Sequence, residues 1–138
     1  MISKYLLTFF LPVLFFISAS HAHQLRCEIY DLATGDILAE SGLIRTTSED
    51  LRKDEPYKLK LEHALMSAEF QLAFLDVNSE TLLFQIRTRE VVNSEFGKFT
   101  IAISELIPGK SYMLGRVFTE ITGYGDNTMS SCKMILEN

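Results

Sequence analysis

The chain has 138 residues, of which 47% are hydrophobic and 22% are charged, with two cysteines and no tryptophan. This length suits one domain, the ordinary charged fraction excludes wholesale disorder, and a formal net charge of −5 argues against a nucleic-acid binder. No acidic residue precedes Glu28, and the first 22 positions are rich in Leu and Phe. The composition therefore separates a leader from a more acidic remainder.

Residues 1–22 have the three-part pattern of a secretory signal peptide. Lys4 gives a positive start, residues 5–17 form an apolar run, and Ser20 and Ala22 occupy the −3 and −1 positions of a small-x-small cleavage site. The run is shorter than the roughly 20 residues that span a bilayer. Cleavage after Ala19 and an uncleaved anchor are the alternatives. We expect residues 23–138 to form one secreted or periplasmic domain without a transmembrane segment.

Beyond residue 22, alternating hydrophobic and polar residues predict strands. The predicted strands are residues 25–30, 37–44, 57–62, 69–74, 82–87, 99–103, 112–122 and 131–136. About seven to eight strands with short polar connections favour an all-β fold, an antiparallel sandwich. Residues 45–56 are the longest segment outside strands, and Ser48 is the predicted N-cap of one helical turn there. A helix over residues 62–74 is an alternative that the alternation disfavours.

Both cysteines fall in the predicted domain. In an oxidising compartment we expect Cys27 and Cys132 to form a disulfide, with two buried thiols as the alternative. The sequence has no CxxC motif, so it indicates neither a redox-active pair nor a zinc site.

A motif near the seventh strand carries a family resemblance. Leu106, Pro108, Gly109 and Tyr112 have the spacing L-x-P-G-x-x-Y, which resembles the tyrosine corner of fibronectin type III and related immunoglobulin-like domains. The resemblance implies an immunoglobulin-like β-sandwich in which the Tyr112 hydroxyl bonds to backbone a few residues upstream. It also implies that the disulfide joins the first and last strands at one edge of the sandwich. The missing tryptophan departs from the family.

The predicted strand over residues 112–122 tests the assignment to an immunoglobulin-like sandwich. Unbroken alternation would place Arg116 on the buried face. A bulge at Gly115 would turn Arg116 outward and would turn Val117, Thr119 and Ile121 inward.

The sequence contains no recognisable catalytic motif. A hydrolase would need His63 beside a Ser or Asp. Cleavage after Ala22 would make His23 the N-terminal residue, whose α-amine and imidazole suit Cu(II), with His63 as a further ligand. This resembles exported copper carriers and oxidative polysaccharide enzymes that begin with His. A copper-binding exported protein is therefore the alternative function, and otherwise we expect no enzymatic activity and no cofactor.

Loop residues provide the candidate binding site. In an immunoglobulin-like sandwich alternate connections cluster at one end, so residues 63–67, 91–96 and 123–128 would lie together. The candidates on them are Met66, Phe96, Tyr124, Asp126 and Asn127. Apolar and aromatic loop residues beside polar ones suit recognition, and the alternative is that the apolar ones cap the core. We expect a non-enzymatic domain that binds a protein or a cell-envelope component there.

Overall fold

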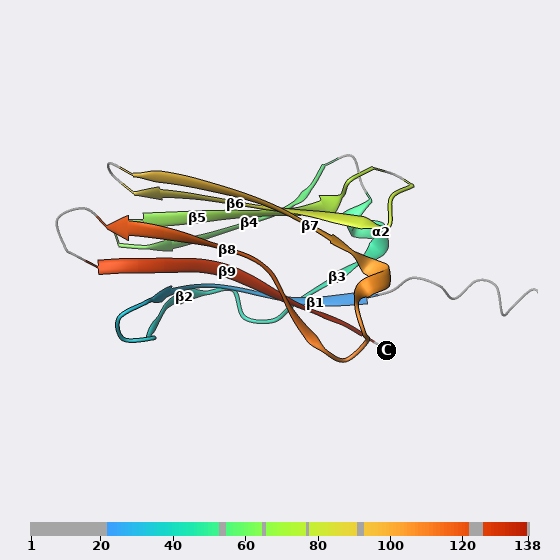
Figure 1. Cartoon of the computed structure of the whole chain (residues 1–138), viewed down its shortest axis with the longest axis horizontal. Coiled ribbons are helices and arrows are strands. Elements are labelled where there is room, and N and C mark those ends of the chain that lie inside the picture. Colours follow the sequence, from blue (N-terminus) through green and yellow to red (C-terminus); the bar gives the residue numbers. More distant parts are fainter. Residues whose placement is uncertain are drawn as a thin grey trace, which may run out of the picture.

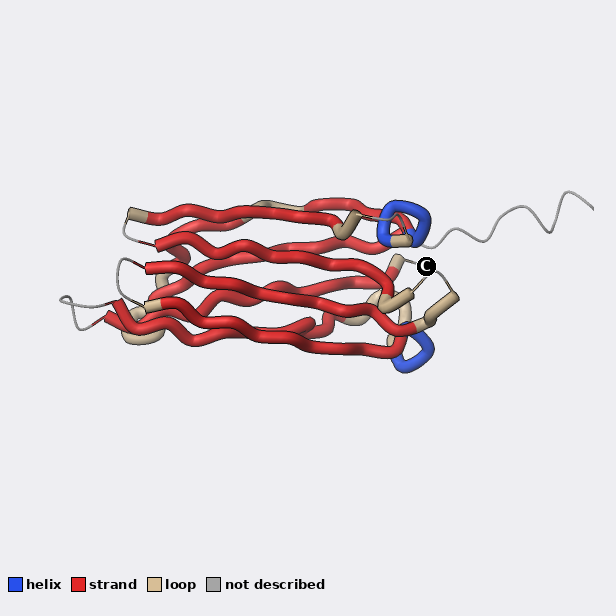
Figure 2. The backbone as a smooth tube through the Cα atoms, turned by 90° about the horizontal axis from the view of Figure 1, so that it is seen from above, coloured by secondary structure: helices blue, strands red, loops and turns tan. Residues whose placement is uncertain are grey.

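The described part of the chain is mostly β-structure. The computed structural model describes residues 22–52, 55–64, 66–76, 78–90, 93–121 and 126–137. Within them, nine antiparallel strands form two sheets that lie face to face (Figure 1). Two short helices, α2 (Ser48–Leu51) and η1 (Ile103–Glu105), lie at one end of the sandwich (Figure 2).

The two sheets take their strands from different parts of the chain. The five-stranded sheet contains β1 (Ala22–Asp31), β2 (Ile37–Glu40), β3 (Ile44–Thr47), β8 (Ser111–Ile121) and β9 (Asp126–Leu136). The four-stranded sheet contains β4 (Tyr57–His63), β5 (Met66–Phe74), β6 (Thr81–Glu90) and β7 (Ser94–Ala102). The all-β antiparallel sandwich is confirmed, with nine strands in place of seven to eight.

The strands follow chain order around the sandwich. The four-stranded sheet has the order β4-β5-β6-β7, and the other has the order β2-β1-β9-β8, with β3 also paired to β1. Strand β7 packs beside β8 where the chain crosses between sheets. Immunoglobulin domains instead distribute their strands as ABED and CFG. The order differs here because hairpins pair consecutive strands within β4 to β7, within β8 and β9, and within β1 and β2.

The predicted strand over residues 37–44 is interrupted. Strand β2 pairs with the second half of β1 and β3 with its first half. Between them, Gly42 has a φ of 69°, which favours glycine, and the Ser41 hydroxyl accepts a hydrogen bond from the Cys27 amide at 3.0 Å. The start of the predicted irregular segment, Arg45 to Thr47, is therefore strand.

The helical turn is present, but its predicted cap is off by one residue. Thr47 is the N-cap: its hydroxyl accepts from the Asp50 amide, and the Asp50 carboxylate accepts from the Thr47 amide. This reciprocal capping box satisfies two amides that the helix leaves unpaired. Ser48 is the first helical residue.

An aromatic row crosses the core of the four-stranded sheet. The ring of Phe84 lies 6.3 Å from that of Phe70 and 6.2 Å from that of Phe99. Phe99 covers Gly115 on β8, where an added Cβ would lie within 2.3 Å of a ring carbon. Glycine at position 115 therefore lets the edges of the two sheets close over the ring.

Strand β8 contains the predicted bulge. Its pairing with β9 shifts between Met113 and Gly115. Arg116 is exposed, whereas Val117 and Thr119 are buried. The bulge thus reverses the alternation as expected, while the side chain of Ile121 lies outside the description.

The disulfide and the corner are both present. Cys27 and Cys132 form a disulfide between directly paired residues of β1 and β9. These strands are central in the five-stranded sheet, so the bridge fastens its middle and not an edge. The Ile107 amide donates to the Tyr112 hydroxyl at 2.8 Å, and Gly109 has a φ of 86°. The corner holds the crossover from β7 to β8.

Candidate functional site

The strands that lead into the three predicted connections all stop at one end of the sandwich. Figure 1 places the ends of β4, β6 and β8 that lead into them opposite α2. There the Asn93 side-chain amide donates to the Glu120 carbonyl at 2.9 Å, and the Leu32 amide donates to the Asn127 carbonyl at 3.0 Å. These bonds tie neighbouring hairpins together.

Most of the candidates at this end lie on strands and not on loops, because the hairpins extend further than the alternation indicated. Met66 begins β5 with 4% exposure, so it belongs to the core. Asp126 and Asn127 begin β9. Phe96 lies on β7 with 52% exposure, and Tyr124 lies outside the described residues.

Hydroxyl groups fill the interior behind these connections. Thr88 and Thr119 are fully buried, and their Oγ1 atoms lie 2.6 Å apart across the two sheets. Thr128 donates to the Thr119 carbonyl at 3.2 Å and to Met66 Sδ at 3.1 Å. This polar contact links the sheets where the apolar core ends.

His23 and His63 lie at opposite ends of the sandwich. His23 is fully buried, with its Nε2 3.3 Å from the Ser48 hydroxyl. His63 is paired with Met66 where β4 meets β5. The Met66 sulfur contacts Thr128, which is paired with Asp31 at the end of β1. Asp31 follows His23 by eight residues in β1, about 26 Å along a strand. The predicted copper pair is therefore not assembled, and within the described residues no group of three or more His, Cys, Asp or Glu side chains is arranged to hold a metal ion.

The outer face of the five-stranded sheet carries an apolar row. Ile37, Tyr30, Met129 and Phe118 are paired in succession across β2, β1, β9 and β8. Ile37 is 55% exposed and Phe118 is 47% exposed. An apolar row of this kind adds contact area for a partner.

The outer face of the four-stranded sheet is basic. Its five cationic side chains, which we call the basic face, are Lys58, Lys60, Arg87, Arg89 and Lys98, all exposed. Among the described residues, two carboxylates share this face, those of Glu62 and Glu69, although the whole chain has 18 Asp and Glu against 13 Lys and Arg. The face therefore has the opposite charge to the molecule.

The two carboxylates offset only part of this positive charge, because Glu62 and Glu69 face five cationic side chains. Lys60 Nζ lies 3.1 Å from Glu62 Oε1 in an exposed pair. The Gln71 side-chain amide donates to Glu69 Oε1 at 2.9 Å. The Arg87 guanidinium lies 5.3 Å from the centre of the exposed Phe96 ring, a cation–π distance. Lys58, Arg89 and Lys98 have no carboxylate at ion-pair distance in the described part of the chain.

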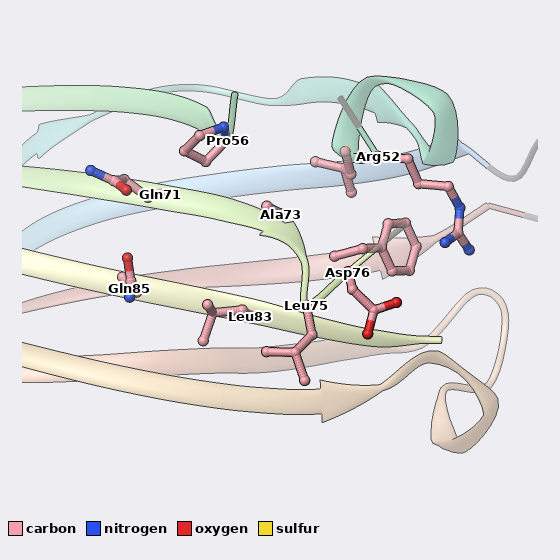
Figure 3. A pocket seen from close by; sticks show the side chains of 10 residues that line it. Arg52, Pro56, Gln71, Ala73, Leu75, Asp76, Leu83 and Gln85 are labelled. Atoms are coloured by element: carbon pink, nitrogen blue, oxygen red, sulfur yellow. The ribbon is translucent and has the colours of Figure 1, made fainter. Parts of the chain in front are cut away.

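A hollow of about 330 Å³ adjoins the basic face beside α2. Its floor includes Ala73 and Leu83, with Gln71 and Gln85 next to them (Figure 3). Arg52 closes one side: its guanidinium lies 3.8 Å from the centre of the Phe74 ring, and its Nη1 donates to the Ser79 carbonyl at 2.8 Å. The hollow therefore combines an apolar floor with side-chain amides.

The basic face was not among the predicted sites. The sequence did contain a sign of this face. Lys58 and Lys60 occupy outward positions of one alternating segment, and Arg87 occupies an outward position of another. Recognising it requires the register that places these segments side by side.

Comparison of the chain with protein-family models, with curated proteins and with solved structures finds no match. Among the described residues, no helix has the length and apolar character needed to cross a bilayer.

Proposed function

We propose that this protein is an exported, non-enzymatic domain that binds an anionic component of the cell envelope through the basic face. The observation that carries the proposal is the concentration of Lys58, Lys60, Arg87, Arg89 and Lys98 on one face of an acidic protein. Such a face attracts anions at long range and suppresses association with cationic partners. The apolar row supplies area but does not specify the chemistry of a partner.

Export is supported by the leader pattern of residues 1–22 and by the disulfide. Ala22 is part of β1: it is 8% exposed, and its carbonyl accepts from the Glu137 amide at 2.9 Å. Cleavage after Ala22 would remove this bond and leave a charged amine on the buried His23. Cleavage after Ala19 keeps the strand whole, so we propose the latter.

The resemblance to immunoglobulin-like domains is compatible with a binding role. Those domains host many roles, and this chain shares with them a two-sheet sandwich and a bonded corner at Tyr112. A rigid sandwich that holds its outer side chains in register suits a binding module, because little freedom is lost when a ligand is bound.

The test is binding to dextran sulfate, with neutral dextran as the reference polymer. We expect binding to dextran sulfate alone, weakening steeply as salt is raised. Arg87→Gln with Arg89→Gln should weaken it severalfold. The control is Arg116→Gln with Lys133→Gln, which makes an equal charge change on the outer face of the other sheet. This control should change the affinity for dextran sulfate less than twofold. Equal losses in both pairs, or no binding at low salt, would refute the proposal.

A further inference from the structure

The pattern of charge on the basic face narrows the ligand class. One row runs across all four strands in the order Lys58, Gln71, Gln85 and Lys98, each directly paired with the next. Neighbouring strands are about 4.8 Å apart, so the two lysines stand about 14 Å apart at their Cα atoms. Two neutral amides lie between the two positive charges.

This spacing suits a ligand whose negative charges are separated by uncharged hydrogen-bonding groups. The Gln71 amide nitrogen is engaged by Glu69, which directs its carbonyl oxygen away from that carboxylate as an acceptor. Gln85 adds both a donor and an acceptor. Ligand hydroxyl groups match these two glutamines, because a hydroxyl both donates and accepts hydrogen bonds. A ligand with a carboxylate or phosphate at every position would instead place acceptor atoms against the acceptor oxygens of the glutamines.

Apolar surface lies on both sides of the row. The next row toward α2 contains Ala73 and Leu83, which form the floor of the hollow (Figure 3). On the other side Phe96 exposes about half of its surface beside Arg87. Flat apolar surfaces pack against the C–H faces of sugar rings, whose edges remain free for hydrogen bonds.

We infer that the ligand of the basic face is an acidic polysaccharide in which charged and neutral sugars alternate. The chain lies across the strands, with its carboxylates at Lys58 and Lys98 and its hydroxyls at Gln71 and Gln85. This inference rests on the proposed function and adds the ligand class to it.

Hyaluronan, in which charged and neutral sugars alternate, is the probe, and poly-glutamate of similar charge is the comparison polymer. The variant is Gln71→Met with Gln85→Met, which keeps side-chain length and removes the amides. We expect the dissociation constant for hyaluronan to rise about tenfold, corresponding to one or two lost hydrogen bonds at about 1.4 kcal/mol per factor of ten. Gln24→Met, on the other sheet, is the matched control and should change it less than twofold.

The outcomes separate the two proposals. Tighter binding of hyaluronan than of poly-glutamate, lost in the paired glutamine variant alone, supports the inference. Equal binding of both polymers, unaffected by the glutamine changes, overturns it and leaves the proposed function standing. Preference for vesicles containing anionic lipid over hyaluronan also overturns it. Binding to neither polymer nor to dextran sulfate overturns both proposals.

Discussion

The buried threonine pair gives a sharp test of the packing at the loop end. Replacing Thr119 by Val preserves shape and volume, so no cavity forms, but the Thr88 hydroxyl loses its partner at 2.6 Å. Both residues are fully buried, so water cannot replace the bond. The single change should lower the free energy of unfolding by about 1–3 kcal/mol, and Thr88→Val should do the same.

The double variant should be less destabilised than the sum of the two single variants, and nearly as stable as the unmodified protein. With both hydroxyls replaced by methyl groups, no polar atom of the pair remains desolvated. Urea unfolding of the disulfide-bonded protein measures all four forms and yields the coupling energy directly. Thr100→Val, at an exposed position, is the control and should stay within about 0.5 kcal/mol. A double variant whose loss equals the sum of the single losses would contradict this account.

Four further outcomes are expected. Replacing both disulfide cysteines by alanine should remove about 4–5 kcal/mol of stability, because the bridge closes a loop of 105 residues, and an unchanged urea midpoint would contradict this. Gly115→Ala should cost about 1–3 kcal/mol, because the new methyl group meets the Phe99 ring; unchanged stability would show that the ring moves freely. Hydrogen bonds from Arg45 hold the pKa of Glu137 below its ordinary value. The pair therefore stabilises the fold fully at pH values above the ordinary carboxylate pKa. This contribution disappears as the pH falls through the lowered pKa. Arg45→Gln should therefore raise the pKa of Glu137 in an NMR titration, and no rise would refute the assignment. If the loop end also contacts the envelope ligand, Tyr124→Ala should weaken binding without lowering the unfolding midpoint, and unchanged binding would remove that residue from the site.

Local features of this fold follow from the sequence, whereas its long-range arrangement does not. The corner at Tyr112 and the bulge at Gly115 depend on residue types within short reach, and both are present. The disulfide is also present, but it was predicted from the presence of two cysteines in an exported domain and not from a local pattern. The pairing of β1 with β9 leaves no local trace, because both strands have the same alternation as their neighbours. The predicted edge position of the disulfide was therefore wrong.

The candidate site depended even more on register. Met66 was predicted on a loop, but the hairpin continues far enough to bury it. The basic face needs three pairings in correct register before Lys58 and Lys98 fall into one row. A shift of one residue in any pairing would move these side chains to the other face of the sheet.

The pairing of β1 with β9 also constrains the order of folding. Strands β2 and β3 cover one side of β1 soon after it is made, but its other side receives its partner only when the end of the chain is available. Contacts between such distant segments slow folding. A chain that is threaded N-terminus first through a membrane would then keep its five-stranded sheet incomplete until the last strand has emerged, and would form the disulfide as the final step of closing that sheet.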